Sequence, residues 1–200
     1  MDIEWTKAGF EQLGFVGWKP LGTLAKGDLP AVHGVYVVTT PPLVSPEFLP
    51  VSVGGPHKHA DLTVPVATLT AAWRGGAEIL YIGKAGGDAG FKDRLWAYAK
   101  QGRGYGAGHF GGRYIWQLPA SQQLVVGWYP TPGVDPGEVE NALLAMHLEE
   151  FGVRPFANLT GGARVHPDKA RALLSQVFRL KAEAERAKDE PEGESAGKRH

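Results

Sequence analysis

The stretch AEILYIGKAGG, residues 77–87, predicts a buried strand that runs directly into a glycine turn. Aliphatic and aromatic residues followed by glycines are the usual pattern of a strand that ends in a turn. The end of this strand carries a phenol, that of Tyr81, and an ammonium group, that of Lys84. The question is why these two groups stand side by side.

Further strands are predicted on both sides of this stretch. GVYVVTT, residues 34–40, is β-branched and aromatic, with Gly before it and Pro-Pro after it, which is a strand signal. YIWQL (114–118) and QLVVGWYP (123–130) predict two more strands, and a short one is expected near residues 49–53. Apart from that strand, residues 41–63 are rich in Pro, Gly, Ser and His without a clear period, which indicates a long insertion.

Helices are predicted between and after these strands. The strongest helix start is DPGEVENALL, in which Asp135 is the N-cap, Pro136 the first helical residue and Glu138 the capping-box acid; Gly152 ends the helix. Asp88 is able to cap an earlier helix. The other helices are expected within the first 30 residues and at residues 67–73, 91–102 and 167–186. Because strands and helices alternate without a regular βαβ rhythm, the pattern predicts an α+β fold.

Composition narrows the function classes. The 200 residues are 43% hydrophobic, enough for one core-bearing domain. The chain has no cysteine, which excludes disulfides, thiolate zinc sites and a Cys nucleophile. No apolar run is long enough to span a membrane, and the N-terminal residues have neither a basic nor an apolar leader pattern, so a cytoplasmic protein without a membrane partner is expected.

One acidic residue stands on the apolar face of the helix that follows Asp135. At 100° per residue, Glu140 lines up with four residues of that face, Leu144, His147, Leu148 and Phe151, whereas the other three acids of the helix point toward solvent. A buried carboxylate costs several kcal/mol unless a cation pairs with it. The pattern leaves two explanations open: a functional carboxylate, or an ordinary ion pair or partly solvated acid of the first turn.

Positive charge is concentrated near the opening stretch, although the whole chain has 21 basic and 21 acidic residues. Between Tyr81 and Tyr114 two acids stand against six basic residues, Lys84, Lys92, Arg94, Lys100, Arg103 and Arg113. Such a surplus among aromatic residues and glycines is typical of a phosphate-backbone surface, and equally of a solvated helix face. Arg94 could clamp a phosphate or pair with Glu140.

Three further polar positions remain ambiguous from the pattern alone. His109 lies in a glycine-rich loop and could assist proton transfer, bind phosphate, or be a surface residue. Asn158, after the Glu140 helix, could be a site residue or a turn former. His57 and His59 could bind a metal ion only adventitiously, since no third ligand is indicated.

Taken together, five motifs resemble the ordered motif set of the GIY-YIG nuclease family. They are GVY at 34–36, YIGKA at 81–85, RLWAY from Arg94, ENALL from Glu140 and PFAN ending at Asn158. The resemblance implies a small, mainly antiparallel three-stranded sheet flanked by helices. The expected organisation is an N-terminal extension packed on the core (1–30), a nuclease domain (31–162, insertion 41–76), a C-terminal helix (163–186) and a disordered tail (187–200).

The resemblance also implies a site. Tyr36 and Tyr81 would face a common centre with Lys84 and Arg94, and Glu140 would hold one divalent metal ion, Mg²⁺ or Mn²⁺. Asn158 matches the asparagine that closes the last motif, and His109 falls where some branches place a histidine. The surrounding basic residues expected to bind nucleic acid are Lys92, Lys100, Arg103 and Arg113.

The implied activity is metal-dependent, tyrosine-assisted hydrolysis of DNA phosphodiester bonds, with RNA left open. Which of Tyr36 and Tyr81 is the base stays open, and cutting both strands at one site would need a homodimer. The sequence departs from the family in its long insertion, so the two tyrosine strands are expected to pair without forming a short hairpin. Two alternatives remain: a non-cleaving nucleic-acid-binding module with the same fold, and an interaction protein in which Glu140 and Arg94 pair.

Overall fold

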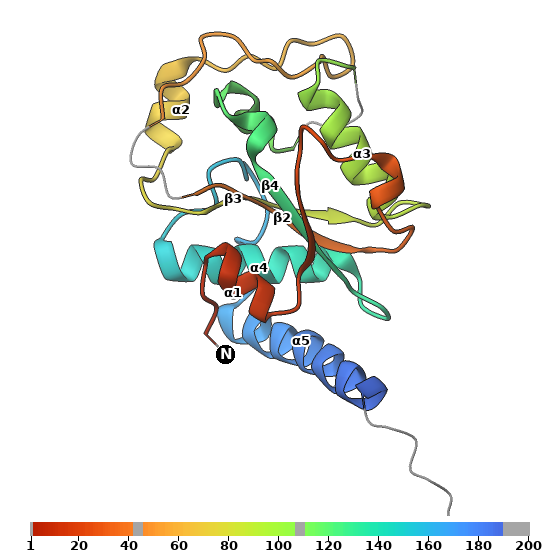
Figure 1. Ribbon diagram of the computed structural model, residues 1–200. Helices are drawn as coiled ribbons and strands as arrows, with labels where there is room; N and C mark the ends of the chain where they lie inside the picture. Colours follow the sequence, from red (N-terminus) through yellow and green to blue (C-terminus); the bar gives the residue numbers. More distant parts are fainter. Residues whose placement is uncertain (1, 42–45, 107–110, 190–200) are drawn as a thin grey trace, which may run out of the picture.

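A computed structural model describes residues 2–41, 46–106 and 111–189. Over these residues the chain is α+β, with one antiparallel sheet covered by helices on both faces (Figure 1). The strand order is β1-β4-β2-β3, and the strands are β1 (Val16–Pro20), β2 (Gly34–Thr39), β3 (Ile79–Ala85) and β4 (Val125–Pro130). The α-helices are α1 (Lys7–Gln12), α2 (Val66–Ala72), α3 (Phe91–Gly102), α4 (Pro136–Phe151) and α5 (Pro167–Asp189).

The two strands that carry the tyrosine motifs are neighbours. β2 is buried along its whole length and pairs antiparallel with β3 on one side and with β4 on the other. In this register Tyr36 faces Gly83, and Val38 faces Tyr81. The expected pairing of the two motif strands across the insertion is therefore confirmed.

The sheet differs from the expected three strands because the N-terminal segment adds β1 to the edge formed by β4. β1 is short, mostly exposed, and irregular at Gly17 and Trp18, where φ is positive. The sequence of β1 thus lacks the alternation of apolar and polar residues that predicts a strand. The first 30 residues belong partly to the sheet rather than only packing on it.

Two other predicted strands are absent from the described residues. The YIWQL segment forms a 3₁₀ helix, η2 (Arg113–Gln117), which follows the left-handed residue Gly112. The Gln117 side chain bonds both Val64 backbone groups and the Leu49 carbonyl, in place of a strand partner. Residues 49–53 also form no strand; Leu49 and Val53 donate their N–H groups to η2 carbonyls instead.

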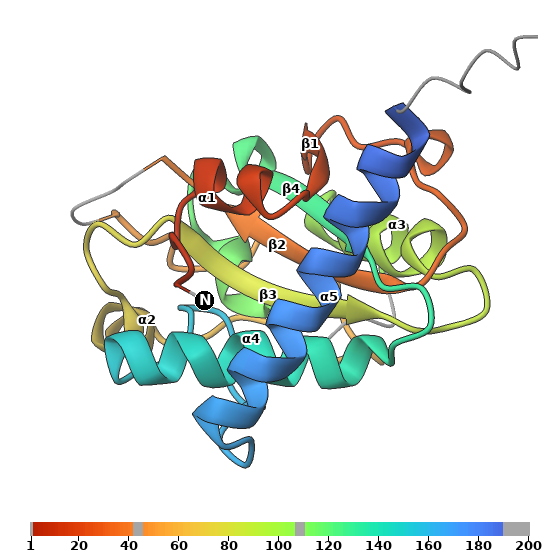
Figure 2. The same ribbon diagram turned by 90° about the horizontal axis from the view of Figure 1, so that it is seen from below.

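The helices form two layers around the sheet. Helices α1, α4 and α5 cover one face, and α2, α3 and η2 cover the other (Figures 1 and 2). Tyr36, Val38 and Leu80 point into the core beneath α3, whereas Val35 and Val37 point toward α4. This alternation along β2 places Tyr36 on the α3 side of the sheet.

The insertion contributes to the core instead of forming a separate unit. After residue 41 the chain passes over the α2 and α3 side of the molecule, in yellow and orange in Figure 1. Leu62, Leu69 and Trp73 from this segment are buried in the same core cluster as Tyr36. Two short 3₁₀ turns, η1 (Lys26–Asp28) and η3 (Ser121–Gln123), complete the connections.

The helix ends follow the predicted signals in part. In α4 the Asp135 side chain accepts the Glu138 N–H at 3.2 Å, and Gly152 ends the helix in the left-handed conformation, as predicted. Asp88 does not cap α3, whose N-cap is Gly90. Helix α5 continues to Asp189, so residues 187–189 of the predicted tail are helical; the remainder of that tail, 190–200, lies outside the described residues.

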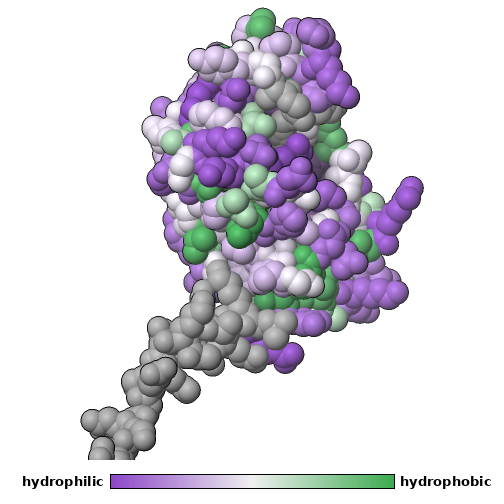
Figure 3. Space-filling model, turned by 90° about the vertical axis from the view of Figure 1, so that its right-hand side faces the viewer, coloured by the Kyte–Doolittle hydropathy of each residue, from purple (hydrophilic) through white to green (hydrophobic). Residues whose placement is uncertain are grey.

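The length and hydropathy of the described helices bear on whether any of them could cross a membrane. None of these helices combines the length and apolar character that crossing a bilayer requires. The side of the molecule seen in Figure 3 is mostly hydrophilic, with hydrophobic residues in small patches.

Candidate active site

Tyr36 and Tyr81 project from adjacent strands toward one another. They stand on the same face of the sheet, diagonal across the β2–β3 pair, with their ring centroids 6.0 Å apart. Tyr36 is fully buried, while Tyr81 is 5% exposed and lines a surface cleft. Tyr81 is therefore the phenol of the pair that a molecule in the cleft can reach.

The glycine of the YIG motif makes room for the first tyrosine. A Cβ atom at Gly83 would stand 2.5 Å from the Tyr36 ring and 2.6 Å from its hydroxyl oxygen. Real Cβ atoms do not approach other heavy atoms so closely, so only glycine permits Tyr36 to lie across β3. The two motifs thus depend on each other through direct packing.

A third tyrosine, Tyr98 of α3, completes the cluster. Its ring centroid is 6.5 Å from that of Tyr36 and 5.8 Å from that of Tyr81, and its hydroxyl donates to the Gly112 carbonyl. The sequence predicted that Tyr98 lies in the helix at residues 91–102, and its local pattern does not indicate the contact with the other phenols.

Burial controls the protonation of these phenols. It raises the pKa of Tyr36 and Tyr98 well above the ordinary value. Burial, with the negative charge of Glu140 as the next cause, raises the pKa of Tyr81 to about 12. All three phenols therefore keep their protons at neutral pH.

Arg94 brings a positive charge to this cluster from α3. Its guanidinium, which is partly buried, interacts with the hydroxyls of Tyr36 and Tyr81 through hydrogen bonds. It also lies close enough to Glu140 for the two charges to influence each other. Arg94 thus connects the phenol pair with the carboxylate.

Glu140 enters the site from α4 and pairs with Lys84. The Lys84 Nζ lies 3.5 Å from the Glu140 Oε2; the lysine side chain is 51% exposed and the glutamate 17%. Burial raises the pKa of Glu140, and the nearby Lys84 charge opposes that rise. The predicted need of Glu140 for a cation is met here by Lys84, with Arg94 contributing at longer range.

Tyr81 and Glu140 meet at an open cleft of about 420 Å³ beside the edge strand β3. Tyr81, Glu140 and Arg113 line it, together with residues 157–161, which follow α4. Arg113, expected only to bind nucleic acid somewhere on the surface, is thus part of the same cleft as the tyrosine and the glutamate. Glu140 is the only acidic residue among the described residues that line it.

Asn158 also lines this cleft, but its amide is engaged with the sheet. Its Oδ1 accepts the Ile82 N–H at 2.8 Å, and its Nδ2 donates to the Ile82 carbonyl at 2.7 Å. Ala157 N–H adds a bond of 2.8 Å to the Leu80 carbonyl. Asn158 therefore closes the free edge of β3 next to Tyr81, a positioning role.

The remaining predicted residues that the structure describes lie outside the cleft. Arg103 donates to the carbonyls of Leu21 and Leu24 and stacks on Trp96, so its guanidinium anchors α3 rather than reaching outward. Lys92 and Lys100 are partly exposed on α3 but do not line the cleft. His109 lies outside the described residues.

The donor set suits a hydrated cation better than a closed metal cage. The described residues contain no group of three or more histidine or acidic side chains able to enclose a metal ion. Mg²⁺, however, keeps several waters and is often held by one or two carboxylates and substrate phosphates. The single, partly buried Glu140 carboxylate in an open cleft fits that mode of binding.

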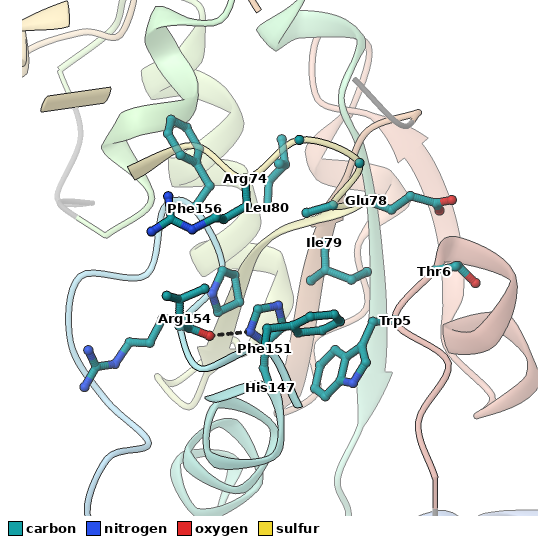
Figure 4. Close-up of a pocket in the computed structure, with 15 residues that line it drawn as sticks. Trp5, Thr6, Arg74, Glu78, Ile79, Leu80, His147, Phe151, Arg154 and Phe156 are labelled. Atoms are coloured by element: carbon teal, nitrogen blue, oxygen red, sulfur yellow. Dashed lines mark hydrogen bonds between the residues drawn. The ribbon is translucent and has the colours of Figure 1, made fainter. Parts of the chain in front are cut away.

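A second cleft, of about 350 Å³, lies at the other end of α4 (Figure 4). It is mainly apolar, with Trp5, Ile79 and Phe151 among its lining residues, and it contains none of the predicted site residues. His147 in its wall donates from Nδ1 to the Val153 carbonyl at 2.8 Å, and burial lowers the pKa of His147 to about 4. At neutral pH His147 is therefore a packed, uncharged imidazole.

Comparison of the chain with models of known protein families, with curated proteins and with solved structures finds no match. The resemblance to the GIY-YIG nucleases therefore rests on the motifs, and the function must be argued from the geometry of the cleft.

Proposed function

We propose that this protein is a metal-dependent endonuclease of the GIY-YIG type that hydrolyses phosphodiester bonds of DNA. The observation that carries the proposal is the convergence of groups from β3, α3 and α4: Tyr81 and Glu140 line one cleft, Lys84 pairs with Glu140, and Arg94 interacts with Tyr81. These four residues were selected from three motifs, which span 59 positions of the sequence from Tyr81 to Glu140. Their meeting at one place is what a nuclease site would require.

The cationic groups would bind the scissile phosphate. The Arg94 guanidinium, oriented by the phenols of Tyr36 and Tyr81, would donate to a phosphoryl oxygen and stabilise the charge that builds there. Arg113, at another wall of the cleft, would contact the same phosphate or its neighbour. Lys84 favours the ionised form of Glu140, because its charge opposes the rise of the Glu140 pKa.

Tyr81 would take the proton from the attacking water. It is the phenol exposed to the cleft, whereas Tyr36 is fully enclosed and positions Arg94 and Tyr81 from behind. With a pKa of about 12, Tyr81 must first release its own proton to water in the open cleft, and its phenolate can then accept one from the attacking water. Since the charge of Glu140 contributes to that high pKa, neutralising the carboxylate favours the phenolate.

Glu140 would hold the metal ion. A bound Mg²⁺ or Mn²⁺ supplies positive charge that neutralises the carboxylate and stabilises the leaving oxygen. The protein's own contribution is a partly buried carboxylate at an open cleft, together with the donors of Arg94 and Arg113.

The alternative is a nucleic-acid-binding module that keeps the fold without cleaving. The burial of Tyr36 and Tyr98 and the raised pKa of every phenol in the cluster favour it, since protonated tyrosines hold a site rigid without doing proton transfer. The two functions differ in whether the phosphodiester bond is broken.

Incubation with supercoiled plasmid and with single-stranded DNA and RNA separates them. We expect nicking with Mg²⁺ or Mn²⁺, none with EDTA, and a loss of at least about a hundredfold in the Glu140→Gln variant. Glu150→Gln, an exposed acid of the same helix outside the cleft, is the matched control and should cleave normally. If the wild-type protein binds these substrates but cuts none of them with either metal ion, the non-cleaving alternative holds.

A further inference from the structure

A neighbouring cleft continues from the candidate active site around the loop that follows Asn158. It has a volume of about 400 Å³ and shares Leu159, Thr160 and Gly161 with the catalytic cleft, so the two openings flank the same few residues. Asn141, the residue after Glu140, lies in its wall. Because the two clefts adjoin, a long polymer bound in one of them either continues through the other or turns away from the protein surface.

The side chains that line this neighbouring cleft favour the binding of an anion. Two arginines, Arg154 and Arg164, line it, and no acidic residue does so among the described lining residues. The Arg154 Nε donates to the Gly161 carbonyl at 2.7 Å, which directs that guanidinium along the loop. Arg164 is exposed to solvent. The positive charge is therefore available on the surface and is not consumed by a carboxylate in the cleft.

The loop between the clefts is held firmly against α4. Gly162 donates its N–H to the Asn141 Oδ1 at 3.2 Å, and a Cβ atom at Gly162 would stand 2.6 Å from the Leu144 Cβ. Gly161 and Gly162 both have positive φ, which glycine adopts without strain. The platform between the two clefts is thus prearranged, which lowers the cost of ordering it when a ligand binds.

We infer that this surface binds the sugar-phosphate backbone of the substrate strand next to the scissile phosphate, with Arg154 and Arg164 as its phosphate contacts. The inference rests on the proposed function and names the path of its substrate. A nucleic-acid strand carries a phosphate about every 3.4 Å along its helix axis, so a strand held at Glu140 presents further phosphates to the adjoining surface. Recognition by arginine and backbone alone is independent of base sequence.

Binding of a short labelled single-stranded DNA, and of an RNA with the same sequence, tests this path by fluorescence anisotropy in EDTA between about 50 and 200 mM salt. Arg164→Ala is expected to weaken binding about fivefold near 0.1 M salt and to lower the slope of log affinity against log salt by about 0.7, the value for one phosphate contact on a single strand. Arg164→Lys should retain most of the affinity. Lys19→Ala removes a cation from β1, at the opposite edge of the sheet, and should change neither quantity.

The outcomes separate this inference from the proposed function. If Arg164→Ala matches the wild type in affinity and slope on both probes, the path is wrong, even when Mg²⁺-dependent cleavage is observed. If the Arg164 dependence is present but no substrate is ever cut, the binding surface stands and the endonuclease proposal fails. An effect on only the DNA or only the RNA identifies which backbone the surface accepts.

Discussion

At the scale of single residues, the site combines groups that are unfavourable to bury. Glu140 is largely removed from water with one exposed lysine as its close partner, and the phenols of Tyr36 and Tyr81 are packed against each other and Arg94. Burial raises the pKa of Glu140, which means that its ionised form is less stable in the folded protein than in the unfolded chain. Perturbed groups that cluster in a cleft are typical of functional sites.

Glu140→Gln is expected to leave stability unchanged or to raise it at pH 7. A group whose folded pKa is raised stabilises the fold most below its unfolded pKa, and this contribution is lost as pH rises through the folded pKa. The amide has no charge to desolvate, and the half-exposed Lys84 can be solvated by water. Urea unfolding with Glu150→Gln as control checks this; a loss above about 1 kcal/mol for Glu140→Gln alone would indicate a structural ion pair.

Tyr81→Phe is expected to remove both cleavage and its pH dependence. Because the pKa of Tyr81 lies at about 12, the phenolate fraction of the wild type grows about tenfold per pH unit between pH 7 and 9. Single-turnover cleavage rates should follow that slope, fall at least about a hundredfold in Tyr81→Phe and lose the slope there. Tyr36→Phe should be slower but keep the slope. A Tyr81→Phe variant with wild-type rates at every pH would exclude Tyr81 as the base.

At the scale of elements, the site depends on how the edge of the sheet is closed. β3 is an edge strand, and the loop after α4 satisfies its free backbone groups at Leu80 and Ile82. Exposed edges invite pairing with other chains, so this closure also protects the sheet. The same loop forms one wall of the candidate active-site cleft, which couples the edge of β3 to the position of Glu140 on α4.

Asn158→Asp should loosen this closure. Aspartate keeps the acceptor for the Ile82 N–H but replaces the donor to the Ile82 carbonyl with a second oxygen, which leaves that carbonyl unpaired. We expect a loss of about 1–3 kcal/mol in the free energy of unfolding. Asn141→Asp is the matched control because its one bond, from the Gly162 N–H, needs only an acceptor. Equal losses in both variants would contradict the clamp.

At the scale of the whole molecule, segments far apart in sequence complete each layer. The N-terminal segment brings Trp5 against His147 of α4, with ring centroids 4.8 Å apart, and Glu78 before β3 accepts the Lys7 N–H (Figure 4 shows Trp5, Glu78 and His147). The insertion closes the opposite face through Leu69 and Trp73. Both additions enlarge the core around a sheet that would otherwise be small.

His147 should make this assembly sensitive to acid. Its folded pKa of about 4 is below the unfolded value of 6.5, so the stability it contributes is present above pH 6.5 and is lost as pH falls toward 4. The loss amounts to about 3 kcal/mol. Glu140, whose pKa is raised, adds stability as pH falls over the same acidic range. The quantity to compare is therefore the difference in unfolding free energy between the wild type and His147→Asn at each pH. Urea unfolding should show a smaller loss in that variant; parallel curves would contradict the assignment.

The sequence alone determined those features that depend on neighbouring residues. The Asp135 cap, the glycine stop of α4 and the place of Glu140 on its inner face follow from capping and from 100° per residue, and all three are found. The β2 and β3 segments follow from their β-branched and aromatic runs. These are local interactions, which a linear pattern records directly.

The tertiary structure decided which groups meet. In the folded chain Lys84 is the close partner of Glu140, and Tyr98 lies beside the other phenols. The Asn158 side chain bonds the backbone of Ile82, and Arg103 donates to backbone carbonyls. The tertiary structure also made β1 a strand and η2 a 3₁₀ helix. Each of these outcomes depends on packing between segments distant in sequence, where the energy of a contact is set by burial and by an available partner rather than by the residues adjoining it.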